Sequence, residues 1–117
     1  MKENLDKTFC KARSFHVPSS VQKINLVADL IRKKDTSAAL IQLQYCRKKV
    51  AKYIYELLKS AISNAENNHG MDIDSLYVKE VLVGKSFTMK RFHARARGRA
   101  SRIEKSRSMI SILVAEK

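Results

Sequence analysis

The residues whose types and spacing best suit binding form a run of cations near the C-terminus. Residues 90–102 read KRFHARARGRASR, which holds six basic residues and no acidic one. Within this run Arg95, Arg97 and Arg99 alternate with alanine and glycine, so an extended strand would carry the guanidinium groups on one face and small residues on the other. Guanidinium groups contact phosphates in pairs and stack on bases. The run therefore predicts a slender strand that binds nucleic-acid backbones.

Aromatic groups stand close to this run. Phe87, Phe92 and His93 offer flat rings on which bases can stack, at about 1–3 kcal/mol per base. A solubilising tail or a localisation signal is the simpler interpretation, but strand-like segments on both sides argue against a tail. Binding to a membrane surface would need large apolar side chains opposite the cations, where alanine and glycine stand instead. Nucleic acid is therefore the favoured partner.

The charge of the whole chain points the same way. Lys and Arg number 24 against 11 Asp and Glu, a formal net charge of +13, and residues 86–117 carry more than half of that excess. Such a chain repels itself unless it meets a polyanion. No apolar stretch approaches the roughly 20 residues that span a bilayer, and the N-terminus is mixed in charge. We therefore expect a soluble, unexported, cytoplasmic protein with no membrane partner.

Enzyme chemistry finds little support. The three histidines share no metal-ligand spacing with Cys, Asp or Glu, and the sequence has neither a glycine-rich phosphate loop nor a serine nucleophile motif. Cys10 and Cys46 lack the spacing of a redox or zinc pair, so they are predicted to be reduced thiols that pack as small hydrophobic residues. We expect no catalytic residue, no metal ion and no cofactor.

A short edge strand and a helix are predicted near the N-terminus. The strand carries apolar residues of one parity and ends at a proline: Phe9, Phe15, Val17 and Pro18. The helix has a stripe at three- and four-residue steps with further apolar residues beside it: Val21, Ile24, Ala28 and Ile31, widened by Leu26, Val27 and Leu30. Ser19 or Ser20 is placed to cap its start, and the cations at 32–34 would close its end, where the helix dipole favours them.

Two more helices are predicted in the middle of the chain. The first is short, begins at a cap from Asp35, Thr36 or Ser37, and runs to about Leu43. The next is the clearest signal, a stripe of about four turns formed by Val50, Ile54, Leu57, Leu58, Ala61, Ile62 and Ala65. Gly70 follows it and can adopt the left-handed conformation that ends a helix.

Two strands frame the cationic run. Residues 76–85 are rich in Val and Leu but change parity after Val78, which indicates a bulge. Ile110, Ile112 and Val114 alternate as a strand packed on one face should. A structureless connection of more than twenty residues would be uncommon in so small a domain. The sequence therefore predicts one domain, residues 1–117, with residues 84–102 as an extended basic β-hairpin arm.

Four segments together resemble a known family. LVADLIR at 26–32, SAISNAENN at 60–68, MKR at 89–91 and RARGRA at 95–100 resemble, in order and spacing, the bacterial-type family of large ribosomal subunit protein twenty-two. The likeness runs from about Cys10 to Val114. It implies an α+β fold of three helices packed on a small three-stranded antiparallel sheet, with a long protruding hairpin.

The resemblance also implies a place and partners. Members of this family lie near the exit of the nascent-peptide tunnel in the large ribosomal subunit, and their hairpin reaches through the ribosomal RNA to the tunnel wall. The implied partners are large-subunit ribosomal RNA, neighbouring large-subunit proteins and the nascent peptide, with a role in subunit assembly and no homo-oligomer.

Site residues follow from the cationic pattern and the resemblance together. Those expected to bind ribosomal RNA are Lys11, Arg13, Lys23, Lys85, Lys90, Arg91, Phe92, His93, Arg95, Arg97, Arg99, Arg102, Lys105 and Arg107. By motif match Met89, Lys90 and Arg91 would lie at or near the hairpin tip. The chain departs from the family pattern at Ala94, where relatives often have proline, and at Cys46, a poorer helix cap than the threonine that many have.

Three functions are compatible with these features. The leading hypothesis is an RNA-anchored structural component of the large ribosomal subunit. The second is a free-standing RNA-binding or RNA-chaperoning module, and the third is a small enzyme. Sedimentation with large subunits or in light fractions separates the first two.

Overall fold

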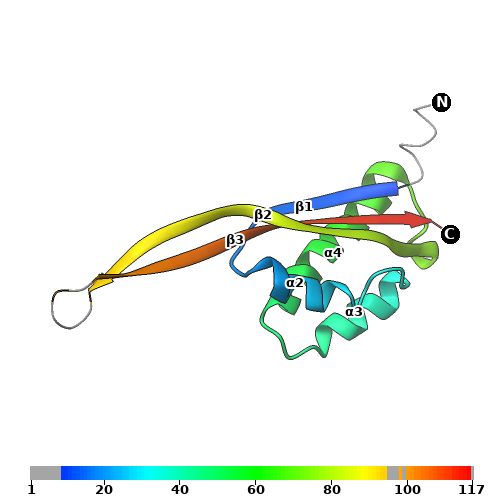
Figure 1. The fold of residues 1–117 in the computed structure, drawn as a ribbon. Coiled ribbons are helices and arrows are strands. Elements are labelled where there is room, and N and C mark those ends of the chain that lie inside the picture. The colour runs from blue at the N-terminus through cyan, green and yellow to red at the C-terminus, as the bar shows by residue number, and fades with distance from the viewer. Residues whose placement is uncertain (1–8, 95–97, 99, 117) are drawn as a thin grey trace.

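Three α-helices and a three-stranded sheet are the main elements of the part of the chain that the structure describes. The computed structural model describes residues 9–94, 98 and 100–116. In chain order the elements are β1 (Phe9–Val17), α2 (Val21–Ala28), α3 (Thr36–Gln44), α4 (Val50–His69), the short 3-10 helix η1 (Ile73–Ser75), β2 (Leu76–Ala94) and β3 (Ala100–Glu116) (Figure 1). This confirms the predicted α+β class.

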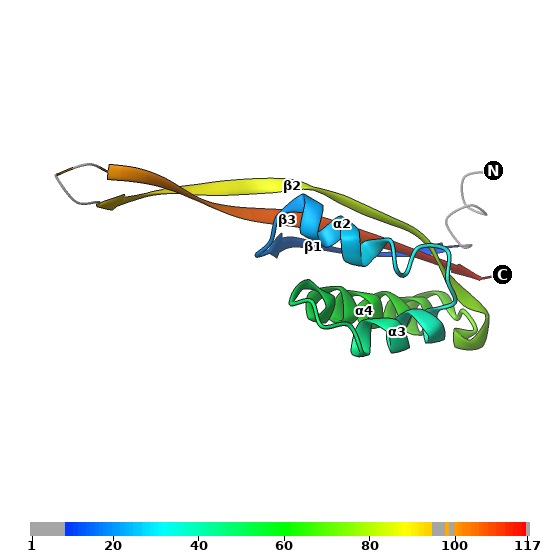
Figure 2. The same ribbon diagram turned by 60° about the horizontal axis from the view of Figure 1, so that its bottom comes forward.

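The sheet is antiparallel, with strand order β1-β3-β2, so β1 lies at an edge as predicted. The helices lie on one side of the sheet (Figure 2). Helix α4 packs on β1 and β3, α2 packs on β2, and α3 packs on α4. The other face of the sheet has no helix over it in the described chain.

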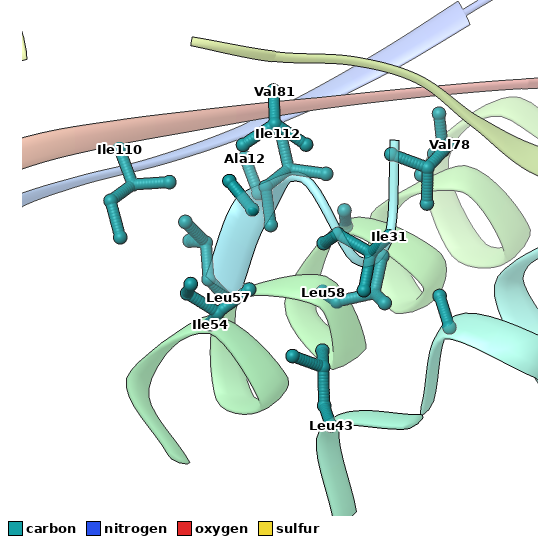
Figure 3. Close-up of a cluster of buried hydrophobic side chains, with 14 of the residues drawn as sticks. Ala12, Ile31, Leu43, Ile54, Leu57, Leu58, Val78, Val81, Ile110 and Ile112 are labelled. Atoms are coloured by element: carbon teal, nitrogen blue, oxygen red, sulfur yellow. The ribbon is translucent and has the colours of Figure 1, made fainter. Parts of the chain in front are cut away.

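The core lies between the sheet and α4. Ile54 and Leu58 of α4 are fully buried against Ile112 and Val78 of the sheet and Ile31 from the turn after α2 (Figure 3). Burying a side chain of this size stabilises the fold by about 1.5–3 kcal/mol. The predicted stripe of the long helix is therefore the main packing surface of the protein.

The apolar residues of one parity that predicted β1 do not all face the core. Cys10 and Ala12 are the buried residues, whereas Phe15 is 47% exposed. The register with β3 shifts between Ser14 and Val17, and this irregularity returns Val17 to the core. Because one extra residue exchanges the two faces of a strand, the alternation of buried and exposed residues does not continue across this irregularity.

Helix α2 ends earlier than its apolar stripe indicates. It stops at Ala28, and residues 29–34 form turns that still bury Ile31. Leu26 and Leu30 are exposed and do not widen the buried stripe. The cations at 32–34 do not close a helix: Arg32 instead donates hydrogen bonds to Val81 O and to Asn25 Oδ1 and pairs with Asp29.

The helix ends agree with the sequence in part. Ser20 and Asp35 stand at the N-caps of α2 and α3, although neither side chain makes a capping hydrogen bond. Gly70 ends α4 with a φ of +62°, the left-handed conformation that it was predicted to supply. The N-cap of α4 is Lys49, so the interpretation of Cys46 as a helix cap is wrong.

Both cysteines pack as predicted. Cys10 is buried in the sheet, and Cys46 is partly buried against the core, each as a free thiol. Burial raises the pKa of the Cys10 thiol, an effect that a hydrogen bond with the Lys11 backbone partly offsets.

Strands β2 and β3 continue far beyond the helices as a hairpin. The register of β2 shifts between Val78 and Glu80, which confirms the predicted bulge. Beyond Lys85, which pairs with Ser108, the two strands stay paired as far as Ala94 and Ala100. We call residues 86–94 and 100–107 the arm, and the rest of the described chain the body. The arm gives the protein principal extents of 63 × 34 × 20 Å (Figure 1).

Candidate nucleic-acid interface

Two of the predicted cations lie on the open face of the sheet. Lys11 and Arg13 are exposed and alternate along β1 with the buried Cys10 and Ala12, so they project away from the helices. The Arg13 guanidinium lies 5.9 Å from the centroid of the Phe15 ring. In such a pair the cation can bind a phosphate while the exposed ring stacks on a base.

The base of the arm gathers rings and cations. The His16 and Phe87 rings meet edge to face, with centroids 5.9 Å apart, and join the end of β1 to β2. Arg107 is the register partner of Phe87 and is half-buried, while Lys85 and Lys105 are exposed. The Oγ of the buried Ser108 donates to Ser19 O, which fixes the turn before α2 against the same point.

Further along the arm, only the backbone register is described for most of the predicted residues. In order, Met89, Lys90, Arg91, Phe92 and His93 of β2 pair with Lys105, Glu104, Ile103, Arg102 and Ser101 of β3. The residues proposed for the tip, 89–91, thus lie within β2, before its end at Ala94. Arg95, Arg97 and Arg99 lie outside the described residues. Gly98, in the same connection, has a φ of +73°, which favours glycine.

A second basic surface lies on the helices. Lys23 of α2 lines a groove together with Lys48, Lys49 and Lys52 from the start of α4. Of these four lysines, only Lys23 was predicted as a site residue. The available signal was the run Arg47-Lys48-Lys49 directly before a strong helix. Cations there oppose the helix dipole, at about 0.3–1 kcal/mol each.

Among the described residues, the ion pair that the structure shows includes none of these cations. In the part of the chain that the structure describes, the ion pair formed is Arg32 with Asp29. The exposed cations of β1, of the arm base and of the groove are therefore available to external anions. Among the described residues, no group of three or more His, Cys, Asp and Glu could hold a metal ion. Of the described helices, none is long and apolar enough to cross a membrane.

Comparisons with known proteins agree with the geometry. Residues 12–115 match the family described as ribosomal protein L22p/L17e. The large ribosomal subunit protein uL22 of Ehrlichia chaffeensis is 50% identical over 113 residues, 97% of this chain and 99% of the relative. The uL22 of Agrobacterium fabrum is 56% identical over 90% of this chain and 80% of its own length, and that of Brucella suis biovar 1 is 53% identical over 99% and 87%.

The match covers both the body and the arm, and the relatives correspond over most of their own length. The resemblance that the four sequence segments carried is thereby confirmed. The chain belongs to the ribosomal protein L22p/L17e family, whose members are structural, non-enzymatic constituents of the large ribosomal subunit.

Proposed function

We propose that this structural constituent of the large ribosomal subunit is anchored by its arm in ribosomal RNA, and that the far part of the arm lines the nascent-peptide exit tunnel. Residues 84–102, the basic β-hairpin predicted from the sequence, would be the functional segment. Met89, Lys90 and Arg91 are the residues proposed to face the tunnel and its nascent peptide. The chain would act as one copy among neighbouring large-subunit proteins rather than as a homo-oligomer.

The observation that carries the proposal is the length of the paired strands beyond the body. A two-stranded hairpin without a packed face is marginal in water. The described side chains at its base include the exposed Lys85, Phe87 and Lys105, which no helix covers. A cationic hairpin of this kind gains its stability from a partner, and folded RNA offers phosphates on both sides of a slender insert.

The number of cations is sufficient for anchoring. Residues 90–102 contain six basic side chains. If each neutralised one phosphate of duplex-like RNA, the logarithm of the binding constant would fall with the logarithm of salt concentration with a slope of roughly −5. A hairpin that contacts several RNA segments in this way would also support subunit assembly, because it would hold the folded segments together.

The test replaces Arg95, Arg97 and Arg99 with alanine in the full chain. We expect an unchanged circular dichroism spectrum for the body and a loss of the protein from large-subunit fractions on sedimentation of a cell extract. A control variant that loses the same charge from the body, with Lys33, Lys59 and Lys79 changed to glutamine, should sediment with large subunits. Normal incorporation of the arginine variant would show that the arm is not the anchor.

A further inference from the structure

We infer that the groove between α2 and the start of α4 is a second nucleic-acid site, which binds the phosphodiester backbone of an RNA segment that crosses the body. The choice of RNA rests on the proposed function. The site itself rests on the geometry and charge of the body and would exist without the arm.

The groove is lined by a cationic wall around a small apolar floor. Its lining residues are Pro18, Ser19, Lys23, Leu26, Lys48, Lys49, Val50, Lys52 and Tyr53. None of these described residues is acidic, and all four lysines are exposed. Leu26 is 59% exposed within it, and Val50 is buried. Four ammonium groups around one hollow form a binding site for a polyanion rather than a solvated helix face.

The position of these lysines is unfavourable for the protein alone. Lys48 and Lys49 precede the first turn of α4 and Lys52 stands in it, where unpaired backbone N–H groups already carry partial positive charge. The first turn of α4 holds no acidic residue, and no side chain caps the helix. A phosphate in the groove would meet both the ammonium groups and this end of the helix, so the same arrangement becomes favourable in the complex.

The cations are also not spread evenly over the helices. Helix α3 packs on α4, yet its sequence TSAALIQLQ contains no charged residue in a chain that is 30% charged. The starts of α2 and α4 lie toward the side of the body from which the arm leaves (Figure 2). The helix starts that line the groove and the base of the arm thus lie at the same end of the body, as two contacts with one RNA mass would require.

The shape of the groove favours a nucleic-acid strand over a membrane. A flat bilayer reaches only the rim of a hollow, whereas a phosphodiester backbone can enter it. Tyr53 is half-buried at the edge, and Lys52 Nζ lies 5.5 Å from the centroid of its ring. The accessible part of a ring beside a cation suits a base or ribose next to its phosphate.

The first experiment measures the salt dependence of binding to a mixed-sequence RNA duplex by fluorescence anisotropy. Changing Lys48, Lys49 and Lys52 to glutamine should make the log-log slope shallower by roughly 2–3, because three phosphate contacts are lost. The matched control changes Lys33, Lys59 and Lys79 to glutamine and should alter the slope by less than about 1. A change no greater than that of the control would overturn the inference.

The second experiment uses a pair of lysines on the same helix. Lys52 and Lys59 are both exposed and lie over the rings of Tyr53 and Tyr55, at 5.5 and 5.3 Å. Only Lys52 stands at the start of α4. Lys52→Glu should therefore raise Tm by a few degrees, on the order of 2–4 °C, and weaken duplex binding more than Lys59→Glu does. A lower Tm than the wild type, or equal binding by the two variants, would contradict the inference.

The outcomes separate this inference from the proposed function. If the arginine variant of the arm loses duplex binding and the groove variants bind as the control does, the groove is not a site and the arm remains the anchor. If neither set changes binding, both proposals fail. If the groove variants lose affinity only for phosphatidylserine vesicles and not for the RNA duplex, the groove binds a membrane and the inference is wrong.

Discussion

The body and the arm are built on the same two strands, yet different interactions hold them. Near the body, β2 and β3 place Val78, Val81 and Ile112 under the helices, where each is at most 2% exposed. Beyond Lys85 the two strands remain paired, but helices no longer cover them, and the described side chains of Phe87 and Lys105 are exposed. The body has a hydrophobic core, whereas no helix covers the paired strands in the described part of the arm.

This difference shows how one sheet can serve two purposes. Backbone pairing fixes the register and direction of the strands, but its net contribution per hydrogen bond is only about 0.5–1.5 kcal/mol. Burial of apolar side chains supplies the remaining stability in the body. No helix covers the described strands of the arm, so the arm can adopt its final geometry against a partner and its sequence is free to carry cations.

The largest expected contrast is in amide hydrogen exchange of the free protein. Amides of Ile110 to Val114 should exchange only through global opening, which for a domain of this size requires about 5–15 kcal/mol. Amides of residues 86–94 and 100–107 should exchange near the unprotected rate. Hydrogen-exchange mass spectrometry with overlapping peptides measures both. Equal protection in the body and the arm would break the comparison, and protection of the arm upon addition of RNA would sharpen it.

The next largest contrast is in the free energy of unfolding after one substitution in the core of the body and one in the arm. Ile54 is fully buried at the centre of α4, so Ile54→Ala leaves a cavity that costs about 2–5 kcal/mol in the free energy of unfolding. Lys105→Ala in the arm removes an exposed side chain and should change that free energy by less than about 0.5 kcal/mol. Urea denaturation followed by circular dichroism gives both values. A comparable loss from the two variants would mean that the arm packs as the body does.

The sequence predicted the features that depend on local periodicity. Three such features are predictable because each involves neighbouring residues: the stripe of α4, the left-handed residue at Gly70 and the bulge after Val78. The pairing of β2 with β3 was also expected, since the apolar strand segments flank a cationic run that needs an ordered partner.

The features that sequence reasoning missed depend on distant parts of the chain. The irregularity of β1 between Ser14 and Val17 exists in its register with β3, so residue spacing alone does not show which face of β1 is buried. The groove brings Lys23 beside Lys48 and Lys52 only through the packing of α2 and α4 on the sheet. Helix α2 ends early, and in the turns after it Arg32 donates hydrogen bonds to Val81 O on β2, a contact that no local pattern contains.

The smallest expected effect concerns the backbone conformation that contacts with β2 impose on the turn after α2. Lys33 adopts a φ of +62°, which costs a residue with a Cβ about 1–2 kcal/mol. Two backbone hydrogen bonds hold it there, from Lys33 N to Val78 O and from Val78 N to Lys34 O. Lys33→Gly should therefore stabilise the protein by about 0.5–1 kcal/mol, the strain relieved less the entropy that glycine adds to the unfolded chain.

Lys33→Ala serves as the control for this substitution, because it removes the charge and keeps the Cβ. It should bring no gain in the free energy of unfolding, measured by the same urea titration. If alanine stabilised the protein as much as glycine, charge repulsion rather than backbone strain would limit this turn. A gain with glycine alone would show that edge contacts with β2 impose a conformation that the residue itself disfavours. The arm has no helix or turn packed on it to impose such strain in the part of the chain that the structure describes, so strain of this kind belongs to the body.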